Sequence, residues 1–241
     1  VFAMTAKDEL MTKTPDALLN GEATVELIQS CVPNIKDAWQ TPSTDFDAIL
    51  IAIRIATYGE QLDFPVDIPN TEITKDYAVD LRILLNKLVS VSFDSECIVQ
   101  GMKCTVRPLT YQEFTKSSLK TFEEQRIFAV VNDDEMSDED KLAKFTTSFK
   151  KLTSLTIDMM AQSVTSITTD EVTVTNADHI REFVLNADKD VFNALKTHFD
   201  TQKEKFSIEP MKITPTDDEK AQGAPEQFEV PIAFDQSNFF V

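Results

Sequence analysis

The sequence contains one strongly apolar stretch, which reads Asp45-Phe-Asp-Ala-Ile-Leu-Ile-Ala-Ile-Arg-Ile-Ala-Thr-Tyr-Gly59. Its apolar residues recur at helical spacing and also fill a second stripe, so the stretch predicts an α-helix. A helix that is apolar on most of its faces is usually buried. Gly59 stands where a left-handed cap commonly ends a helix. The first stripe is Phe46, Ile49, Leu50, Ile53 and Ala56, and the second is Ile51 and Ile55.

Arg54 is a charged residue inside this apolar helix. An unpaired buried charge is costly, so we expect Arg54 to pair with a carboxylate. A core ion pair or a side chain that reaches out to water is one interpretation. The other is contact with a partner protein, and we keep Arg54 as a candidate partner-binding residue.

Helices and short antiparallel strands are predicted along the rest of the chain, which places it in the α+β class. The predicted strands are 61–68, 77–81, 98–107 (a hairpin around Gly101), 164–167, 172–175, 207–213 and 227–234. Long helices are predicted at 110–131, 137–162 and 188–205. In the second of these, one face carries Leu142, Phe145, Phe149, Leu152, Leu155 and Met159.

Two lobes are expected, each built from helices and a small antiparallel sheet. Residues 1–90 form the first, and residues 91–241 form the second with a helical insertion at about 131–175 and a terminal strand. Val1-Phe-Ala-Met-Thr-Ala-Lys-Asp8 matches Val106-Arg-Pro-Leu-Thr-Tyr-Gln-Glu113, and Tyr77-Ala-Val-Asp-Leu81 parallels Phe228-Glu-Val-Pro-Ile232. An internal duplication explains these matches. Chance also explains them, because capped helices often follow strands.

The charge of the chain limits its partners. It has 241 residues with 41 acidic and 23 basic side chains, giving a net charge of -18. Nucleic acid and anionic membranes would repel such a chain, so we expect neither as a partner. No apolar run approaches the ~20 residues that a spanning helix needs.

Known catalytic and cofactor motifs are missing from the sequence. The four glycines form no phosphate-binding loop. His179 and His198 have no spacing that indicates a catalytic triad. Cys97 and Cys104 are one loose pair, whereas structural zinc usually needs two close pairs. The sequence therefore predicts a non-enzyme without cofactor, metal or small-molecule substrate, and three cysteines that stay reduced.

The C-terminal residues are a second candidate for partner binding. Exposed neighbouring aromatic residues at a chain end usually dock somewhere. One interpretation is docking onto the chain's own final sheet, and the other is insertion into a groove of a partner. The candidate residues here are Phe234, Phe239, Phe240 and Val241.

The chain also resembles a known family. The resemblance rests on the apolar stretch above and on Met4-Thr-Ala-Lys-Asp-Glu-Leu10, Thr14-Pro-Asp-Ala-Leu-Leu-Asn-Gly21, Ser30-Cys-Val-Pro-Asn-Ile-Lys-Asp37 and Pro231-Ile-Ala-Phe-Asp-Gln-Ser-Asn-Phe-Phe240. These segments are similar to the baseplate hub subunit family of T-even-like tailed phages. Relatives often carry paired cysteines where this chain has Phe64–Thr71 and Ile208–Pro215 without cysteine, so a metal site is not carried over.

The resemblance implies a hub subunit or a hub assembly factor that binds other baseplate hub or tail proteins. Its expected place is the host cytoplasm during assembly, and the virion baseplate if it stays in the particle. The alternative is an adaptor or chaperone-like binding module unrelated to phages.

Overall fold

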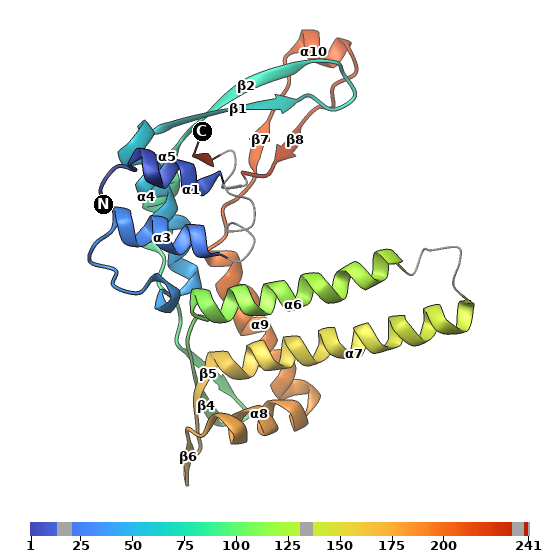
Figure 1. The fold of residues 1–241 in the computed structure, drawn as a ribbon. Helices are drawn as coiled ribbons and strands as arrows, with labels where there is room; N and C mark the ends of the chain where they lie inside the picture. The colour runs from blue at the N-terminus through green and yellow to red at the C-terminus, as the bar shows by residue number, and fades with distance from the viewer. Residues whose placement is uncertain (14–20, 131–136, 233–238, 241) are drawn as a thin grey trace. The chain divides into compact units, whose positions relative to one another are not determined.

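A computed structural model gives the fold, and it describes residues 1–13, 21–130, 137–232 and 239–240 (Figure 1). Helices and small antiparallel sheets make up these residues, which confirms the predicted α+β class. Contacts divide the chain into two compact units. Unit 1 consists of Val1–Ala38, Asp45–Val91 and Phe206–Val241, and unit 2 consists of Trp39–Thr44 and Ser92–Lys205.

The apolar stretch forms the central helix of unit 1, α4 (Phe46–Tyr58). Gly59 follows it with φ 93° and ψ -176°, a conformation that favours glycine but is not the left-handed cap that we expected. Ile51 and Ile53 of α4 are fully buried. Around the unit's core lie α1 (Ala6–Thr12), α3 (Glu22–Cys31) and α5 (Leu81–Ser90). Short 3-10 turns occur at Ala38–Gln40 and Ser43–Asp45, where the assignment changes to unit 2 and back.

Two small hairpins complete unit 1. Strands β1 (Gln61–Asp67) and β2 (Thr74–Asp80) pair antiparallel, with Gln61 opposite Asp80. Strands β7 (Met211–Ile213) and β8 (Phe228–Val230) form the second hairpin, and α10 (Asp217–Ala221) lies between them in sequence.

The end of the chain groups with unit 1, whereas the sequence-based division placed it in the second lobe. Ion pairs give a physical reason for the grouping. Lys75 Nζ lies 3.2 Å from Glu219 Oε1, and Lys87 Nζ lies 2.8 Å from Glu209 Oε1. Residues after 205 therefore contact β2 and α5. The second segment of unit 1 ends at Val91, and the division into two lobes near residue 90 stays a prediction.

Unit 2 is built on a four-stranded antiparallel sheet in the order β3-β4-β5-β6. The strands are β3 (Glu96–Val99), β4 (Met102–Val106), β5 (Val164–Thr168) and β6 (Thr173–Val174). Helices α8 (Ala177–Asn186) and α9 (Lys189–Lys205) supply Ile180 and Leu195 to the same buried core as Cys104 and Val106. Strand β5 is an inner strand and therefore an integral part of this sheet. We expected this segment inside a helical insertion at about 131–175.

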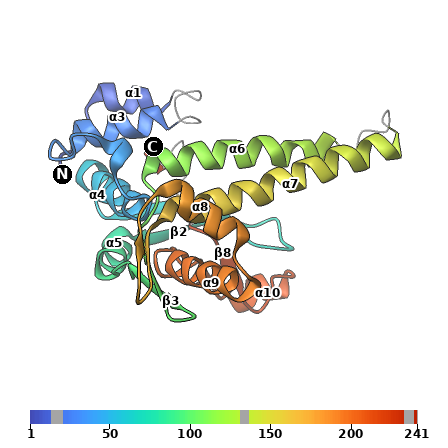
Figure 2. The same cartoon turned by 90° about the horizontal axis from the view of Figure 1, so that it is seen from below.

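Two long helices of unit 2, α6 (Tyr111–Val130) and α7 (Asp138–Ser163), run antiparallel side by side (Figures 1 and 2). We call them the α6–α7 hairpin. Thr110 begins α6 through reciprocal bonds with Glu113, and Ser137 caps α7 by accepting from the backbone N–H of Asp140.

The proposed repeat has structural counterparts at the start of each half. Thr5 and Asp8 form a capping box, and Thr110 and Glu113 exchange the same two hydrogen bonds. Segments 77–81 and 228–232 both contribute to strands, β2 and β8. Capping boxes are common, so the duplication stays a prediction.

Candidate partner-binding site

Arg54 lies on α4 with only 6% of its surface exposed. The helical spacing of four residues places Tyr58 beside it. The guanidinium carbon lies 4.4 Å from the centroid of the Tyr58 ring, a distance at which the cation is attracted to the ring face. The Tyr58 ring therefore stabilises part of the positive charge of Arg54.

The expected carboxylate partner of Arg54 is not found in the part of the chain that the structure describes. Its Nε and Nη1 atoms are buried there without a hydrogen-bond partner. Burial lowers the pKa of Arg54, and Tyr58 opposes that shift. Among the described residues the Tyr58 ring lies beside the guanidinium, and a carboxylate partner of Arg54 stays a prediction.

The C-terminal aromatic residues pack against their own chain. Phe239 and Phe240 are each 2% exposed, and their rings meet edge to face at 5.0 Å between centroids. The Tyr58 hydroxyl lies 3.1 Å from the carbonyl oxygen of Phe240 and 3.1 Å from Glu9 Oε1. It has one proton, so it donates to one of these acceptors at a time.

We call Glu9, Arg54, Tyr58, Phe239 and Phe240 the tail cluster. It unites two regions that the sequence singled out separately, the charged position in the apolar helix and the aromatic end. Burial raises the pKa of Tyr58, and the hydrogen bond with Glu9 adds to this shift. A partner would reach these rings only after the tail leaves its place, so their role in partner binding stays a prediction. Phe234 and Val241 lie outside the described residues.

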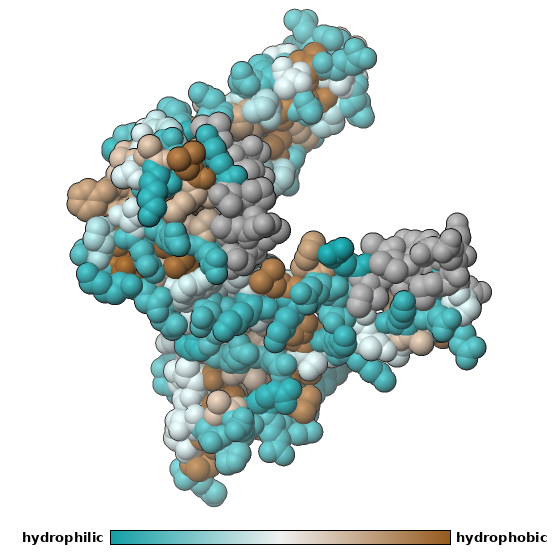
Figure 3. All heavy atoms as spheres, in the orientation of Figure 1, coloured by the Kyte–Doolittle hydropathy of each residue, from teal (hydrophilic) through white to brown (hydrophobic). Residues whose placement is uncertain are grey.

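The largest exposed aromatic side chains of unit 2 lie on the α6–α7 hairpin, which sequence reasoning did not select. Phe122 is 56% exposed, Phe149 is 60% exposed and Leu142 is 66% exposed. The sequence indicated a common face for Leu142, Phe145 and Phe149, and a buried face was the natural interpretation of that pattern. Figure 3 shows apolar atoms among polar ones along these helices.

Two serines of the α6–α7 hairpin are buried, and one ion pair joins its helices. Ser117 and Ser148 are buried, and Lys151 Nζ lies 2.9 Å from Glu124 Oε1 across the two helices. Serine is mostly exposed in proteins and phenylalanine is mostly buried. The reverse arrangement is unusual for a helical hairpin that is stable without a partner. The sequence offered one signal for the exposed rings. Ser117 follows Phe114 by three residues, and Ser148 follows Phe145 by three residues.

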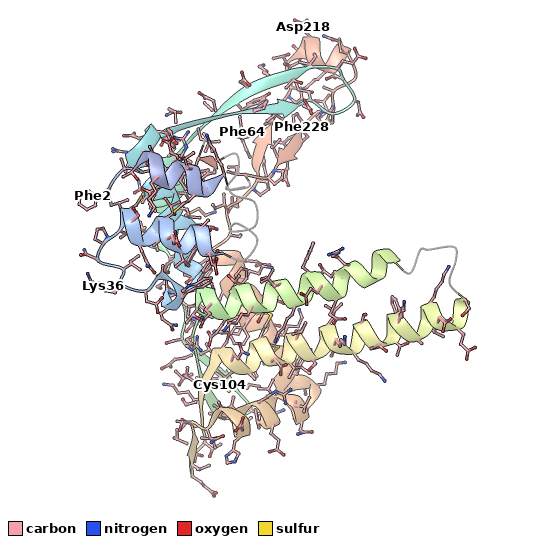
Figure 4. The ribbon with its side chains drawn as sticks, viewed as in Figure 1. Phe2, Lys36, Phe64, Cys104, Asp218 and Phe228 are labelled. Atoms are coloured by element: carbon pink, nitrogen blue, oxygen red, sulfur yellow. The ribbon has the colours of Figure 1, made fainter. Side chains whose placement is uncertain are left out.

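Cys97, Cys104 and His198, which we considered for metal binding or catalysis, make packing contacts within unit 2. Cys97 lies opposite Cys104 in the β3–β4 register, and both thiols are buried. Figure 4 labels Cys104. His198 Nε2 lies 3.0 Å from the carbonyl oxygen of Asp94, which joins α9 to the segment before β3. Within the described ranges, no three His, Cys, Asp or Glu side chains gather as a metal site would require.

A family model described as T4 bacteriophage base plate protein matches residues 3–220. No curated protein and no solved structure matches the chain. Of the helices that the structure describes, none has the length and apolar character needed to cross a membrane.

Proposed function

Because the chain belongs to the T4 bacteriophage base plate protein family, we propose that it serves the central hub of the baseplate, as a hub subunit or as an assembly factor. The family match over residues 3–220 is the observation that carries this proposal. It covers all of unit 2 and most of unit 1. A phage baseplate protein is expected to bind other tail proteins. Family membership also argues against an adaptor unrelated to phages.

The hub is the finer part of the proposal. It is supported by the resemblance of the segments at 4–10, 14–21, 30–37 and 45–59 and of the last residues to the hub subunit family. We propose that the protein acts by binding and without catalysis. Its glycines, histidines and cysteines support this view, since none of them forms a known catalytic motif.

Binding requires surfaces that the folded chain leaves open. Fifteen large hydrophobic residues among those described are exposed, and those on the α6–α7 hairpin are the most concentrated aromatic group in unit 2. Exposed apolar groups of this kind mark interaction sites more often than chance exposure does. The protein would meet its partners in the host cytoplasm and stay in the virion if it is a subunit.

A genetic experiment tests the proposal. A stop codon early in the gene should leave phage heads intact and block complete baseplates and tails, as seen by electron microscopy of infected lysates. Supplying the intact chain from a plasmid should restore tails. Normal infectious tails without the protein would overturn the proposal.

Mass spectrometry of purified virions then separates the two roles. A hub subunit is present at a fixed ratio to other baseplate proteins, whereas an assembly factor is absent from finished particles.

A further inference from the structure

The β1–β2 hairpin of unit 1 is a sheet of two strands, so each strand has one edge without a neighbouring strand (Figure 1). Hydrogen bonds at the two ends of the hairpin show which backbone groups face these edges. Ile68 donates its N–H to the carbonyl oxygen of Ile73 at 2.9 Å, and Leu81 donates to that of Glu60 at 2.8 Å. Hydrogen-bonded and non-hydrogen-bonded pairs alternate along an antiparallel ladder, and residues of the second kind point their N–H and C=O groups to the free edges.

The two free edges differ because one of them contains a proline. Counted from either end of the hairpin, Pro65 of β1 and Asp76 of β2 form a non-hydrogen-bonded pair. Proline has no N–H, so the edge of β1 lacks a donor at this position, a device that blocks the addition of another strand. The edge of β2 keeps the N–H groups of Thr74, Asp76 and Ala78, and all three residues are exposed. Between the two ends of the hairpin, no other backbone segment of the described residues pairs with β2.

The outer face of the hairpin is acidic. It carries four aspartates and neither lysine nor arginine. Its residues are Gln61, Asp63, Pro65, Asp67, Thr74, Asp76, Ala78 and Asp80. The Thr74 hydroxyl donates to Asp67 at 2.7 Å, and Asp80 caps α5 by accepting from the backbone N–H of Arg82. Neither bond neutralises a carboxylate, so the face keeps its negative charge.

The opposite face of the hairpin is apolar. Its apolar side chains are buried or half-buried, and they are Leu62, Phe64, Val66, Tyr77 and Val79. Lys75 also lies on this face, and its ammonium group pairs with Glu219 at 3.2 Å. The nearest cation in sequence after β2 is Arg82, which pairs with Glu60. Both cations are thus engaged by carboxylates that lie outside the outer face.

A third strand beside β2 would continue both faces of the hairpin, because side chains alternate along a strand. Opposite charges in directly opposed positions stabilise a pair of strands, and like charges destabilise it. A strand with basic side chains on the side of Asp76 and apolar ones on the side of Tyr77 therefore fits this edge. From 61 to 80 the chain has five acidic residues and one lysine, so two copies that pair through this edge would bring like charges together.

We propose that the free edge of β2 binds an extended segment of another protein, with alternating basic and apolar residues, as a third strand of the hairpin. The backbone groups of Thr74, Asp76 and Ala78 form the main-chain hydrogen bonds, and Asp76 selects the basic side chains. The added strand also stabilises the hairpin, since two strands alone are marginally stable. The inference rests on the proposed function only for its setting, in which the partner is another baseplate protein.

A binding assay with the full-length chain tests the inference. The probe is a labelled peptide of about eight residues, a usual strand length, with alternating lysine and valine. One control peptide is N-methylated on two neighbouring central residues, which blocks both of its edges and keeps its charge and side chains. A second control has glutamate in place of lysine. Fluorescence anisotropy should show binding of the probe and about tenfold weaker binding of both controls.

Variants of the backbone edge locate the site. Ala78→Pro removes an N–H group that faces the free edge and leaves the ladder with β1 intact, so it should weaken binding of the probe about tenfold. Ala78→Ser is the matched control, because it keeps the N–H group, and it should leave binding unchanged. Circular dichroism checks that both variants keep their fold.

A charge reversal tests the selection of basic side chains without altering the backbone. Asp76→Lys should weaken binding of the lysine probe several-fold and should strengthen binding of the glutamate peptide above that of the unsubstituted chain. Asp170→Lys, at an exposed position of unit 2, changes the net charge equally and should leave both affinities nearly unchanged.

Several results would overturn the inference. These are failure of the probe to bind, equal binding of the N-methylated peptide, and equal loss of binding in Asp170→Lys and Asp76→Lys. The last result would indicate general attraction to an acidic chain. Dimerisation of the chain that Ala78→Pro abolishes and Ala78→Ser preserves would assign the edge to a second copy.

The outcome is separable from that of the proposed function. A baseplate defect in the gene knockout without peptide binding removes only the assignment of the β2 edge. Peptide binding with normal tails in the knockout removes only the hub role.

Discussion

The Tyr58 hydroxyl lies 3.1 Å from the carbonyl oxygen of Phe240, which joins the end of α4 to a residue 182 positions later. Phe239 and Phe240 are buried, so these two residues form part of the core of unit 1. The tail is therefore expected to contribute to stability before it contributes to binding.

Removing the buried ring of the tail tests this expectation. Phe240→Ala should lower the free energy of unfolding by about 3–5 kcal/mol, as is usual for a fully buried phenylalanine. Urea unfolding followed by circular dichroism measures the change. Phe2→Ala is the matched control in the same unit, because Phe2 lies exposed near the N-terminus (Figure 4), and it should change stability by less than about 0.5 kcal/mol. Unchanged stability with lost partner binding would show that the tail docks on another protein.

Tyr58→Phe tests the hydrogen bond separately from the packing. It keeps the ring under Arg54 and removes the hydroxyl, so we expect a loss of about 1 kcal/mol. In the Phe240→Ala background the effect of Tyr58→Phe should shrink, since the two residues form one contact. Additive effects in a double-mutant cycle would indicate that Glu9 is the main acceptor.

Replacing Arg54 tests the account of its surroundings. Arg54→Met fills similar space without a charge, so stability should stay within about 1 kcal/mol of the original or rise. Arg54→Ala removes the packed stem as well and should cost about 2 kcal/mol. The same urea titration compares both. A loss of 3 kcal/mol or more in Arg54→Met would mean that a buried carboxylate depends on this cation.

The pair of Arg107 and Glu113 should make unit 2 sensitive to acid. Both oxygens of Glu113 lie 2.8 Å from guanidinium nitrogens of Arg107, and this bond holds the pKa of Glu113 below its ordinary value of 4.5. A lowered folded-state pKa stabilises the fold at pH values above 4.5, and the contribution is lost as the pH falls through the folded-state pKa.

Glu113→Gln should therefore reduce stability by about 1 kcal/mol at pH 7, a value discounted for partial exposure. The difference from the unsubstituted chain should shrink as the pH falls below 4.5. Thermal melts from pH 7 into the acidic range measure it, with Glu182→Gln on the exposed side of α8 as the control. A difference that stays constant throughout acid titration would contradict the assignment.

The three cysteines should react slowly in the folded chain. Burial raises the pKa of Cys31 and of Cys104 to about 11, and it also raises the pKa of Cys97. Few thiolates exist at pH 8 under these conditions, and the thiolate is the reactive form. A thiol-disulfide reagent such as Ellman's reagent should modify all three quickly in denaturant and slowly in buffer. Fast reaction in buffer would place at least one thiol at the surface.

Local sequence patterns predicted the elements well. The spacing of the apolar residues and the expected capping residues predicted a helix at 45–58. In the structure this helix begins at Phe46 and ends at Tyr58. The hairpin at Gly101 and the paired strands around 164–175 were also predicted, because glycine and alternating apolar residues act over a few positions.

Relations between distant residues could not be predicted in this way. Nothing local indicates that Phe240 meets Tyr58, or that residues 206–241 group with the first unit. The exposure of the aromatic face of α7 was missed for a different reason. An apolar face on a helix predicts burial, whereas Phe149 is 60% exposed.

The most direct measurement for the account is chemical crosslinking in phage-infected cells, followed by purification of the tagged full-length chain and mass spectrometry. The account predicts crosslinks from this chain to proteins of the baseplate hub or tail, enriched over an untagged infection. Crosslinks to host proteins alone, at the level of the untagged control for all tail proteins, would contradict a role in building the baseplate.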